Sequence, residues 1–227
     1  MRFSQILLQL QGGLGFGTGF RFPGIERFII MKDRRACGGE SGMGESELWI
    51  ERDYATAKRV IDASPLNEFS YTNAGTTPKD FFYGCIALAQ GDVNGARKFF
   101  ETARARYEAA VMESPDSAER HANLGLTYAL MGRKEDAIRE GRRAVELKPE
   151  SLDAVDGVLM NCYLALIYAR CGENDLTIPL IERLLKTPGA VDSADYSVTV
   201  NDLKHRWEWD PIRNDSRFQQ LIAHSSP

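Results

Sequence analysis

The chain has 227 residues, of which 43% are hydrophobic and 26% are charged, an ordinary balance for a soluble protein that buries a core. Its formal net charge of −4 makes nucleic acid an unlikely partner, because nucleic-acid binders usually present a basic face. No apolar run is long enough to span a bilayer, so we expect no membrane segment.

The four cysteines form no C-x-x-C pair. We interpret them as reduced thiols in a cytosol-like compartment, with two or three in the helical core. The first ten residues faintly resemble a secretory leader, but glutamines interrupt the apolar run and no small-residue cleavage site follows. We therefore expect a cytoplasmic protein. The cysteines are Cys37, Cys85, Cys162 and Cys171.

Residues 1–44 differ in composition from the remainder, since ten of the twenty glycines lie there. The glycine run from Gly12 to Gly19 allows the hypothesis of a loop that cradles a phosphate. Its spacing fits neither G-x-G-x-x-G nor G-x-x-x-x-G-K-[ST], and no clear strand precedes it. We therefore predict an irregular, Gly-rich N-terminal arm over 1–44.

Helical periodicity occupies residues 45–205. The segment from Tyr54 to Ala63 has the pattern of a second helix in a degraded repeat, and residues 66–76 carry Asn, Thr and Gly typical of a loop. Thr77-Pro78-Lys79-Asp80 then predicts a helix start, with a capping hydroxyl and a proline in the first turn.

The clearest pattern is the stretch from Ala118 to Pro149. Its first part predicts a helix that Gly132 ends, and its second part predicts another helix that Pro149 stops. Asp116 and Glu119 have the spacing of a capping box for the first helix. We expect Gly125 and Ala137 to let the two helices approach closely, while Leu124, Tyr128 and Ile138 fill the seam between them. The apolar stripe of the second helix consists of Ala137, Ile138, Ala144, Val145 and Leu147.

This pattern resembles the tetratricopeptide repeat, a helix-turn-helix unit of about 34 residues. Two positions depart from that family: His121, where Trp is common, and Gly141, where a bulky residue is usual. The resemblance implies neighbouring copies, because one hairpin cannot bury its own apolar face. We expect Gly141 to leave room for the preceding second helix around Tyr107 and Val111.

Two further copies share the frame of the central one. Gly84, Ala96 and Ala103 have the spacing of Gly125, Ala137 and Ala144, with Gly91 at the turn. The later copy has its turn at Gly172. The turn glycines are 41 and 40 residues apart, so each copy carries an insertion close to two helical turns. In the later copy, the positions that match Leu124, Gly125, Tyr128, Ala137 and Ala144 are Leu164, Ala165, Tyr168, Thr177 and Leu184.

The C-terminal stretch from Trp207 to Phe218 resembles a W-D-P-L-R-x-D-P-R-F tail. Such tails close the repeat regions of some large bacterial proteins that carry a Ser/Thr kinase, a cyclase or a DNA-binding module upstream. Ser216 stands where that pattern usually has Pro. We expect a short helix from Thr199 to His205, and then a cap and tail over 206–227, with a helix starting at Asp210-Pro211 and a second at Asn214 or Asp215.

Reactive residues do not form a recognisable catalytic pattern. His121 falls at a packing site, while His205 and His224 are isolated, and no H-E-x-x-H or G-x-S-x-G motif occurs. The arginines and lysines of residues 133–143 alternate with acids, which favours a solvated helix face over a phosphate or nucleic-acid patch. We predict no enzyme activity, no cofactor and no metal site.

In the family that the repeats resemble, first helices line a concave groove that holds peptides. The resemblance implies a partner-binding groove here that suits an apolar or helical segment. Asn123 fits an Asn of the family's carboxylate clamp, whose cationic part is missing. An equal alternative is that the protein's own N-terminal arm or tail covers this face. The groove residues are Phe81, Cys85, Ala122, Asn123, Leu126, Ala129, Tyr163 and Leu166.

The sequence therefore predicts an all-α, helix-turn-helix solenoid like that of tetratricopeptide proteins, with a C-terminal helical cap. The expected function is a protein–protein interaction scaffold or regulatory module with a protein or peptide partner. Two alternatives stay open: a C-terminal regulatory fragment of a larger signalling enzyme, and a nucleic-acid-linked transcriptional regulator. The sequence does not specify the oligomeric state.

Overall fold

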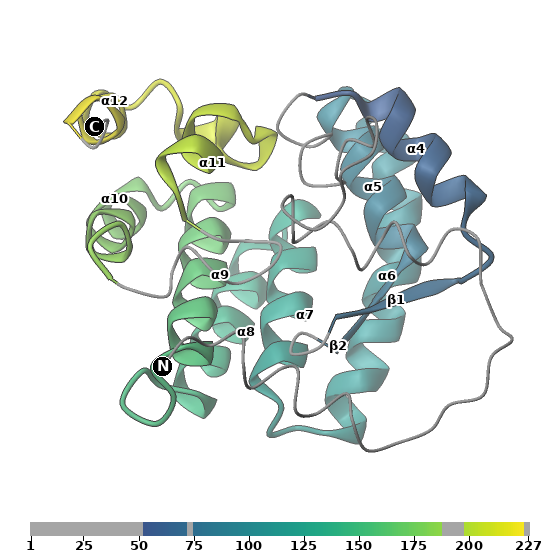
Figure 1. The fold of residues 1–227 in the computed structure, drawn as a ribbon. Coiled ribbons are helices and arrows are strands. Elements are labelled where there is room, and N and C mark those ends of the chain that lie inside the picture. Colours follow the sequence, from purple (N-terminus) through teal and green to yellow (C-terminus); the bar gives the residue numbers. More distant parts are fainter. Residues whose placement is uncertain (1–51, 72–74, 188–197, 225–227) are drawn as a thin grey trace, which may run out of the picture. The chain divides into compact units, whose positions relative to one another are not determined.

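The structure is a computed structural model that describes residues 52–71, 75–187 and 198–224. The predicted N-terminal arm and its glycine run lie outside the described residues. In the part that is described, the fold is all-α apart from one short β-hairpin (Figure 1).

Three antiparallel helix pairs form the body of the protein. The first pair is α5 (Lys79–Ala89) with α6 (Val93–Glu113), and the second is α7 (Ala118–Leu130) with α8 (Lys134–Leu147). The third is α9 (Asp156–Arg170) with α10 (Asn174–Leu184). Each pair packs on the next through α6 against α7, α8 against α9 and α7 against α9. This is the stacked-hairpin arrangement of tetratricopeptide repeats.

A glycine in the left-handed region makes each turn within a pair. Gly91, Gly132 and Gly172 have φ values of 84°, 76° and 74°, which only glycine adopts without strain. After each glycine, the next N–H bonds back to a carbonyl five residues earlier, for example Arg133 N to Tyr128 O at 2.8 Å. This is the Schellman way of closing a helix end. The predicted turn positions are confirmed.

Close approach of the helices depends on Gly125 and Gly141. A Cβ on Gly125 would lie 2.9 Å from the Gly141 nitrogen and 3.1 Å from the Ala137 oxygen, so α7 and α8 meet backbone to backbone. A Cβ on Gly141 would lie 2.8 Å from Cδ1 of Ile167. The expectation that Gly141 faces the preceding second helix is therefore wrong. It faces α9, because the following helix pair packs against this side of α8.

The helix α4 (Tyr54–Ala63) precedes the repeats and has the predicted bounds. It packs on α5, where the Tyr83 hydroxyl donates to Oδ1 of Asp62 at 2.7 Å. The first helix of this degraded repeat, which we expect to be shortened or lost, would belong to residues outside those that the structure describes.

The loop predicted over 66–76 is wrong. The chain there forms an antiparallel hairpin of β1 (Glu68–Tyr71) and β2 (Gly75–Pro78), in which Phe69 is opposite Thr77. The Phe69 ring packs edge-on against Phe82 at 5.6 Å between centroids, and this contact holds the strand on α5.

Two helix starts differ from the prediction for a local reason. Because β2 continues to Pro78, α5 begins only at Lys79 and has no side-chain cap, so Thr77 is not a capping hydroxyl. Before α7 the cap is Ser117, whose Oγ accepts from the Arg120 N–H at 3.4 Å, and Asp116 lies outside the helix.

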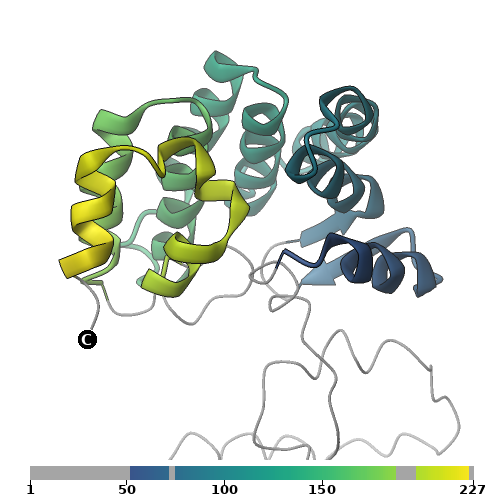
Figure 2. The ribbon, with the colours of Figure 1, turned by 90° about the horizontal axis from the view of Figure 1, so that it is seen from above.

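The C-terminal segment folds back on the last helix pair (Figure 2). It consists of α11 (Val200–His205), the 3₁₀ helix η2 (Trp207–Ile212) and α12 (Ser216–His224). η2 packs against α9, and α12 packs against α10 and α11. Five large apolar side chains of η2 and α12 are at most 8% exposed, which is how a cap behaves. These residues are Trp207, Trp209, Ile212, Phe218 and Ile222.

The polar residues of this cap explain the sequence motif. Asp210 and Pro211 lie inside η2, so the predicted helix start there is wrong. The Arg213 guanidinium donates to the carbonyls of Leu203, Lys204 and Arg206 and thereby closes the end of α11. Asp215 accepts from the Arg217 N–H at 2.9 Å, which confirms the predicted start of the last helix.

Candidate functional site

The first helices of the pairs, α5, α7 and α9, form what we call the first-helix face, where the sequence predicted a partner groove. All eight predicted groove residues are buried, with exposed fractions of at most 7%. None of them offers a surface to a partner in this conformation, and their role in binding stays a proposal. The eight are Phe81, Cys85, Ala122, Asn123, Leu126, Ala129, Tyr163 and Leu166.

The protein's own tail covers part of this face. η2 lies against α9, and the Arg170 guanidinium at the end of α9 stacks 5.1 Å from the Trp207 ring centroid. Burial raises the pKa of Cys85 on α5 well above its usual value, and the charges of Glu208, Arg170 and Arg206 also act on it. The tail packs against α9, and the charges of Glu208 and Arg206 act on the Cys85 thiol of α5.

The tail contains a buried ion pair of its own and is linked to the start of the described chain by a bidentate clasp. Arg206 and Glu208 pair at 2.7 Å with side chains only 10% and 8% exposed. Arg52, just before α4, donates to both carboxylate oxygens of Asp210 at 2.9 and 2.6 Å and to the His205 carbonyl at 3.1 Å. Arg52 has φ of 58°, an unfavourable backbone conformation for a non-glycine residue. The clasp joins the start of the described chain to its end.

Two buried donors between the tail and α9 lack hydrogen-bond partners among the described residues. They are Nε of Arg170 and Nε1 of Trp207. Burial lowers the pKa of Arg170, as expected for a guanidinium removed from water. Leaving a buried donor unpaired costs about 1–3 kcal/mol, so the tail is not an ideal occupant of this face.

The cysteines and His121 have structural surroundings. Burial raises the pKa of Cys162 to about 12, which removes thiolate character at neutral pH. His121 is 7% exposed, with Nδ1 2.6 Å from Oε2 of Glu140 and Nε2 2.9 Å from the Pro115 carbonyl. This ring ties α7 to α8 and to the preceding turn. Within the described ranges, no group of His, Cys, Asp and Glu is arranged to hold a metal ion.

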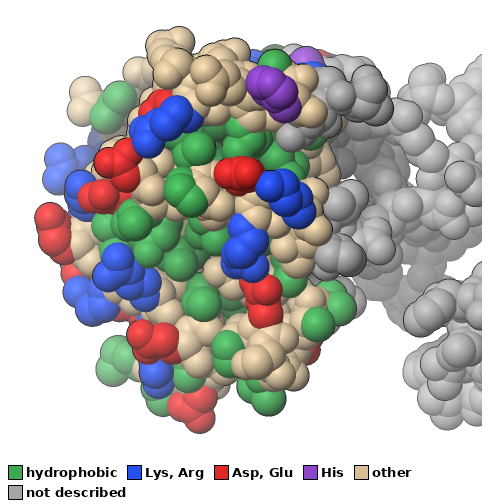
Figure 3. Space-filling model, turned by 90° about the vertical axis from the view of Figure 1, so that its left-hand side faces the viewer, with side chains coloured by type: hydrophobic (Ala, Val, Ile, Leu, Met, Phe, Trp, Pro, Cys, Tyr) green, Lys and Arg blue, Asp and Glu red, His purple; other side chains and the backbone are tan. Residues whose placement is uncertain are grey.

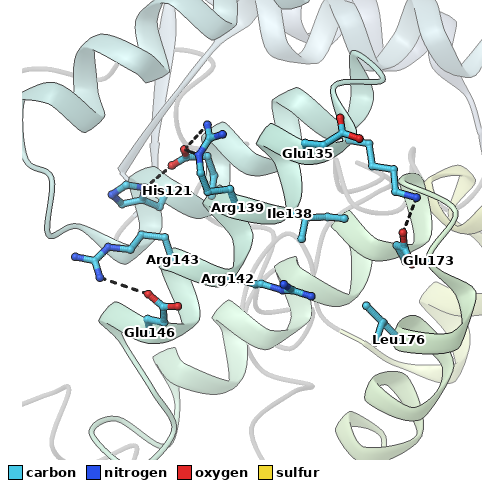
Figure 4. Close-up of a pocket in the computed structure, with 11 residues that line it drawn as sticks. His121, Glu135, Ile138, Arg139, Arg142, Arg143, Glu146, Glu173 and Leu176 are labelled. Carbon is cyan, nitrogen blue, oxygen red and sulfur yellow. Dashed lines mark hydrogen bonds and ion pairs between the residues drawn. The ribbon is translucent and has the colours of Figure 1, made fainter.

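The second helices, α6, α8 and α10, form the second-helix face, and here a pocket of about 720 Å³ is open (Figure 4). We call it the α8 pocket, because α8 supplies eight of its eleven lining residues. His121 comes from α7, and Glu173 and Leu176 come from the start of α10. The α8 members are Lys134, Glu135, Ile138, Arg139, Glu140, Arg142, Arg143 and Glu146.

Ion pairs occupy both ends of the α8 pocket. At one end Arg139 pairs with Glu140 at 3.0 Å and with Asp136 at 2.7 Å. At the other end Lys134 of α8 pairs with Glu173 at 2.5 Å, which links α8 to α10. Apart from His121, the lining carries equal numbers of basic and acidic side chains, so the pocket has no large net charge.

Arg142 is different from the other bases of the pocket. Its Nε donates to the Tyr168 hydroxyl at 3.0 Å and its guanidinium lies 5.8 Å from the Tyr168 ring centroid. No carboxylate of the described residues pairs with it. In Figure 4 its side chain extends toward the region of Ile138 and Leu176, away from His121. Leu176 is 42% exposed, so an apolar surface adjoins an unpaired cation.

Apolar and charged side chains are also interspersed elsewhere on the surface. Figure 3 shows apolar side chains interspersed with Lys, Arg, Asp and Glu on the side that carries α10 and α12. The sequence prediction of a solvated helix face for the basic run holds for Arg133, Arg139 and Arg143, which pair with acids on their own helix. It missed Arg142, and the sequence offers no signal for this, because Glu146 stands four residues after Arg142 but pairs with Arg143.

Comparison with known families points to the same repeats. The family model described as tetratricopeptide repeat matches residues 83–150, from α5 to just beyond α8. The match supports a tetratricopeptide-repeat family for this chain. No curated protein and no solved structure matches it. In the described part of the chain, no helix combines the length and apolar character needed to cross a membrane.

Proposed function

We propose that this protein is a non-catalytic interaction module that holds a segment of a partner protein. Tetratricopeptide repeats generally mediate protein–protein interactions, and the match over 83–150 supports that class. The residues most able to do chemistry have structural roles: the thiols of Cys85 and Cys162 are buried and His121 is held by two acceptors. A broad activity screen is expected to give no turnover that a single Asp, Glu, His or Cys substitution abolishes.

We place the partner on the second-helix face. The single observation that carries this is the contrast in access: the α8 pocket is open, whereas the eight groove residues of the first-helix face are buried. A partner that used the groove would have to displace η2 from α9.

The test is affinity capture by the full-length chain from an extract of its own organism, followed by mass spectrometry. The informative variant is Leu176→Glu, which puts a charge on an exposed apolar position of the pocket. The matched control is Val93→Glu, at a 63% exposed apolar position of α6 outside the pocket. A partner that is retained by the control and lost by Leu176→Glu supports the proposal. Equal capture by both variants, or no protein enriched by the wild type, contradicts it.

A second candidate is binding in the groove after displacement of the tail, favoured by the unpaired donors of Arg170 and Trp207. The two candidates differ in hydrogen exchange of residues 206–212. Binding on the second-helix face leaves the exchange of these amides unchanged, whereas displacement of η2 raises it. The signalling-enzyme and nucleic-acid alternatives draw no support from the described residues, where most of the α8 arginines are paired with carboxylates.

A further inference from the structure

The α8 pocket carries a charge pattern that specifies a ligand. Among the four basic side chains that line it, Lys134, Arg139 and Arg143 each pair with a carboxylate, and only Arg142 does not. The Tyr168 hydroxyl uses the Nε–H of Arg142. The four N–H groups on its two terminal nitrogens have no hydrogen-bond partner within the described residues. A guanidinium in this state presents a fork that matches a carboxylate.

Tyr168 orients this fork. The tyrosine is 7% exposed and belongs to the packed core of α9, so its hydroxyl is a fixed acceptor. The bond at 3.0 Å fixes the inner edge of the guanidinium and leaves the outer edge toward the pocket. An exposed arginine elsewhere, such as Arg97 on α6, has no comparable anchor and lies outside the pocket.

An apolar surface accompanies the cation. Ile138 lies four residues before Arg142 and therefore on the same side of α8, and Leu176 approaches from α10. Leu176 is 42% exposed in an otherwise charged lining. A ligand that fills both features needs a carboxylate and an apolar side chain close to each other.

We propose that the α8 pocket binds an acidic segment of a partner protein, with one carboxylate on Arg142 and one apolar side chain on Ile138 and Leu176. This inference rests on the proposed function, because it names the partner chemistry of the same face. A second acid of the segment meets Arg143, whose own pair with Glu146 is long, at 3.5 Å, and exposed on both sides. Such a pair is weak and exchanges its partner readily.

Charge balance selects a short acidic segment over a polyanion. Glu135, Glu140, Glu146 and Glu173 also line the pocket, and a phosphodiester backbone would run past these acids. A protein segment can place one or two carboxylates at the arginines and neutral residues elsewhere. The pocket volume of about 720 Å³ accommodates a few side chains.

The experiment is fluorescence anisotropy with the full-length protein and a short labelled peptide in which leucine is flanked by glutamates. A neutral peptide has glutamine in place of glutamate, and a short DNA duplex serves as the polyanion. We expect the acidic peptide to bind and the neutral peptide to bind about tenfold more weakly, since charged hydrogen bonds are the strong ones. Arg142→Gln should weaken the acidic peptide about tenfold, and Arg97→Gln should leave its affinity unchanged.

Several results overturn the proposal: no binding of the acidic peptide to the wild type, equal loss in Arg142→Gln and Arg97→Gln, or DNA binding that Arg142→Gln abolishes. Leu176→Ala adds an independent check, because it should weaken the leucine peptide and not its alanine counterpart. Each variant is first shown to melt like the wild type. If the peptides fail while the captured partner is still lost in Leu176→Glu, the proposed function stands and only the acidic chemistry is wrong.

Discussion

The two faces of the helix pairs differ in what covers them. On the first-helix face, every residue of α7 from His121 to Leu130 is buried, and so is every residue of α9 from Gly157 to Ala169. On the second-helix face, α8 buries only Ala137, Gly141 and Ala144. α7 packs on α6, α8 and α9, and α9 packs on α7, α8, α10 and η2, whereas α8 packs on α7 and α9. The difference is that the first-helix face is buried in this conformation, and it is the reason why we propose the second-helix face as the partner site.

The largest effect should come from removing the tail. Truncation after Lys204 takes away Trp207, Trp209 and Phe218, which are at most 3% exposed. Loss of a single buried Trp or Phe side chain typically costs about 3–5 kcal/mol, a large part of the stability of a domain. We expect the truncated chain to melt far below the wild type and to aggregate through its uncovered first-helix face.

Removal of residues 225–227 alone is the control and should leave the melting temperature unchanged. Acrylamide quenching gives an independent readout in a Trp49→Phe background, since Trp49 lies outside the described residues. Trp207 and Trp209 should be poorly quenched in the full-length chain. Strong quenching together with an unchanged melt of the truncated chain would show that the tail is an exposed docking segment and not a cap.

The next effect in size should come from Gly141→Leu. A Cβ at this position already lies 2.8 Å from Ile167 and 3.1 Å from Leu164, so a leucine overpacks the contact between α8 and α9. Overpacking typically costs about 1–3 kcal/mol in unfolding free energy, measured by urea or thermal unfolding. The smaller variant Gly141→Ala should be partly rescued by Ile167→Val, which removes the Cδ1 atom in question. Additive effects in that pair would mean that Ile167 is not the contact.

Local patterns were enough to predict much of the fold. The bounds of α4, the turns at Gly91, Gly132 and Gly172, and the burial of Thr177 and Leu184 follow from spacing, propensity and repeat frame. These features depend on residues within one hairpin. In a repeat protein such features are determined by the sequence of each repeat and its immediate neighbours.

What could not be predicted depends on contacts between distant residues. The β-hairpin is held by the packing of the Phe69 ring against Phe82. The helix that Gly141 faces depends on which neighbouring helix pair packs against that side of α8. The predicted groove residues are buried, and the tail that packs on α9 bonds to Arg52 through Asp210, 158 residues away. No spacing in the sequence predicts the contact between Arg52 and Asp210. The unpaired state of Arg142 likewise emerges only once Tyr168 of the next repeat is in place.

A modest effect is expected from breaking the clasp of the first-helix face. Arg52 and Asp210 are 41% and 42% exposed, and ion pairs of this kind are worth about 0.2–1 kcal/mol. A double-mutant cycle of Arg52→Ala and Asp210→Ala should give a coupling free energy in that range. The coupling should shrink as salt is added, because exposed charges are screened. No coupling at low salt would mean that burial of the tryptophans alone holds the tail.

An effect as small as that of the clasp, but of opposite sign, is a gain in stability from Ser216→Pro. Ser216 is the first residue of α12, a position where proline is favoured because its fixed φ suits the helix and its missing N–H is an unbonded donor anyway. Within the described residues the Ser216 N–H donates no hydrogen bond, and Asp215 in front of it already caps the helix through the Arg217 N–H. Proline at a compatible site stabilises by about 0.4–1 kcal/mol by restricting the unfolded chain. Ser216→Ala controls for loss of the hydroxyl and should be close to neutral.

Because Ser216→Pro strengthens only the cap, the melting temperature should rise slightly while the affinity of the α8 pocket for the acidic peptide stays the same. A lower melting temperature would show that Asp215 cannot keep its capping geometry in front of a proline, and a changed peptide affinity would show that the two faces are coupled.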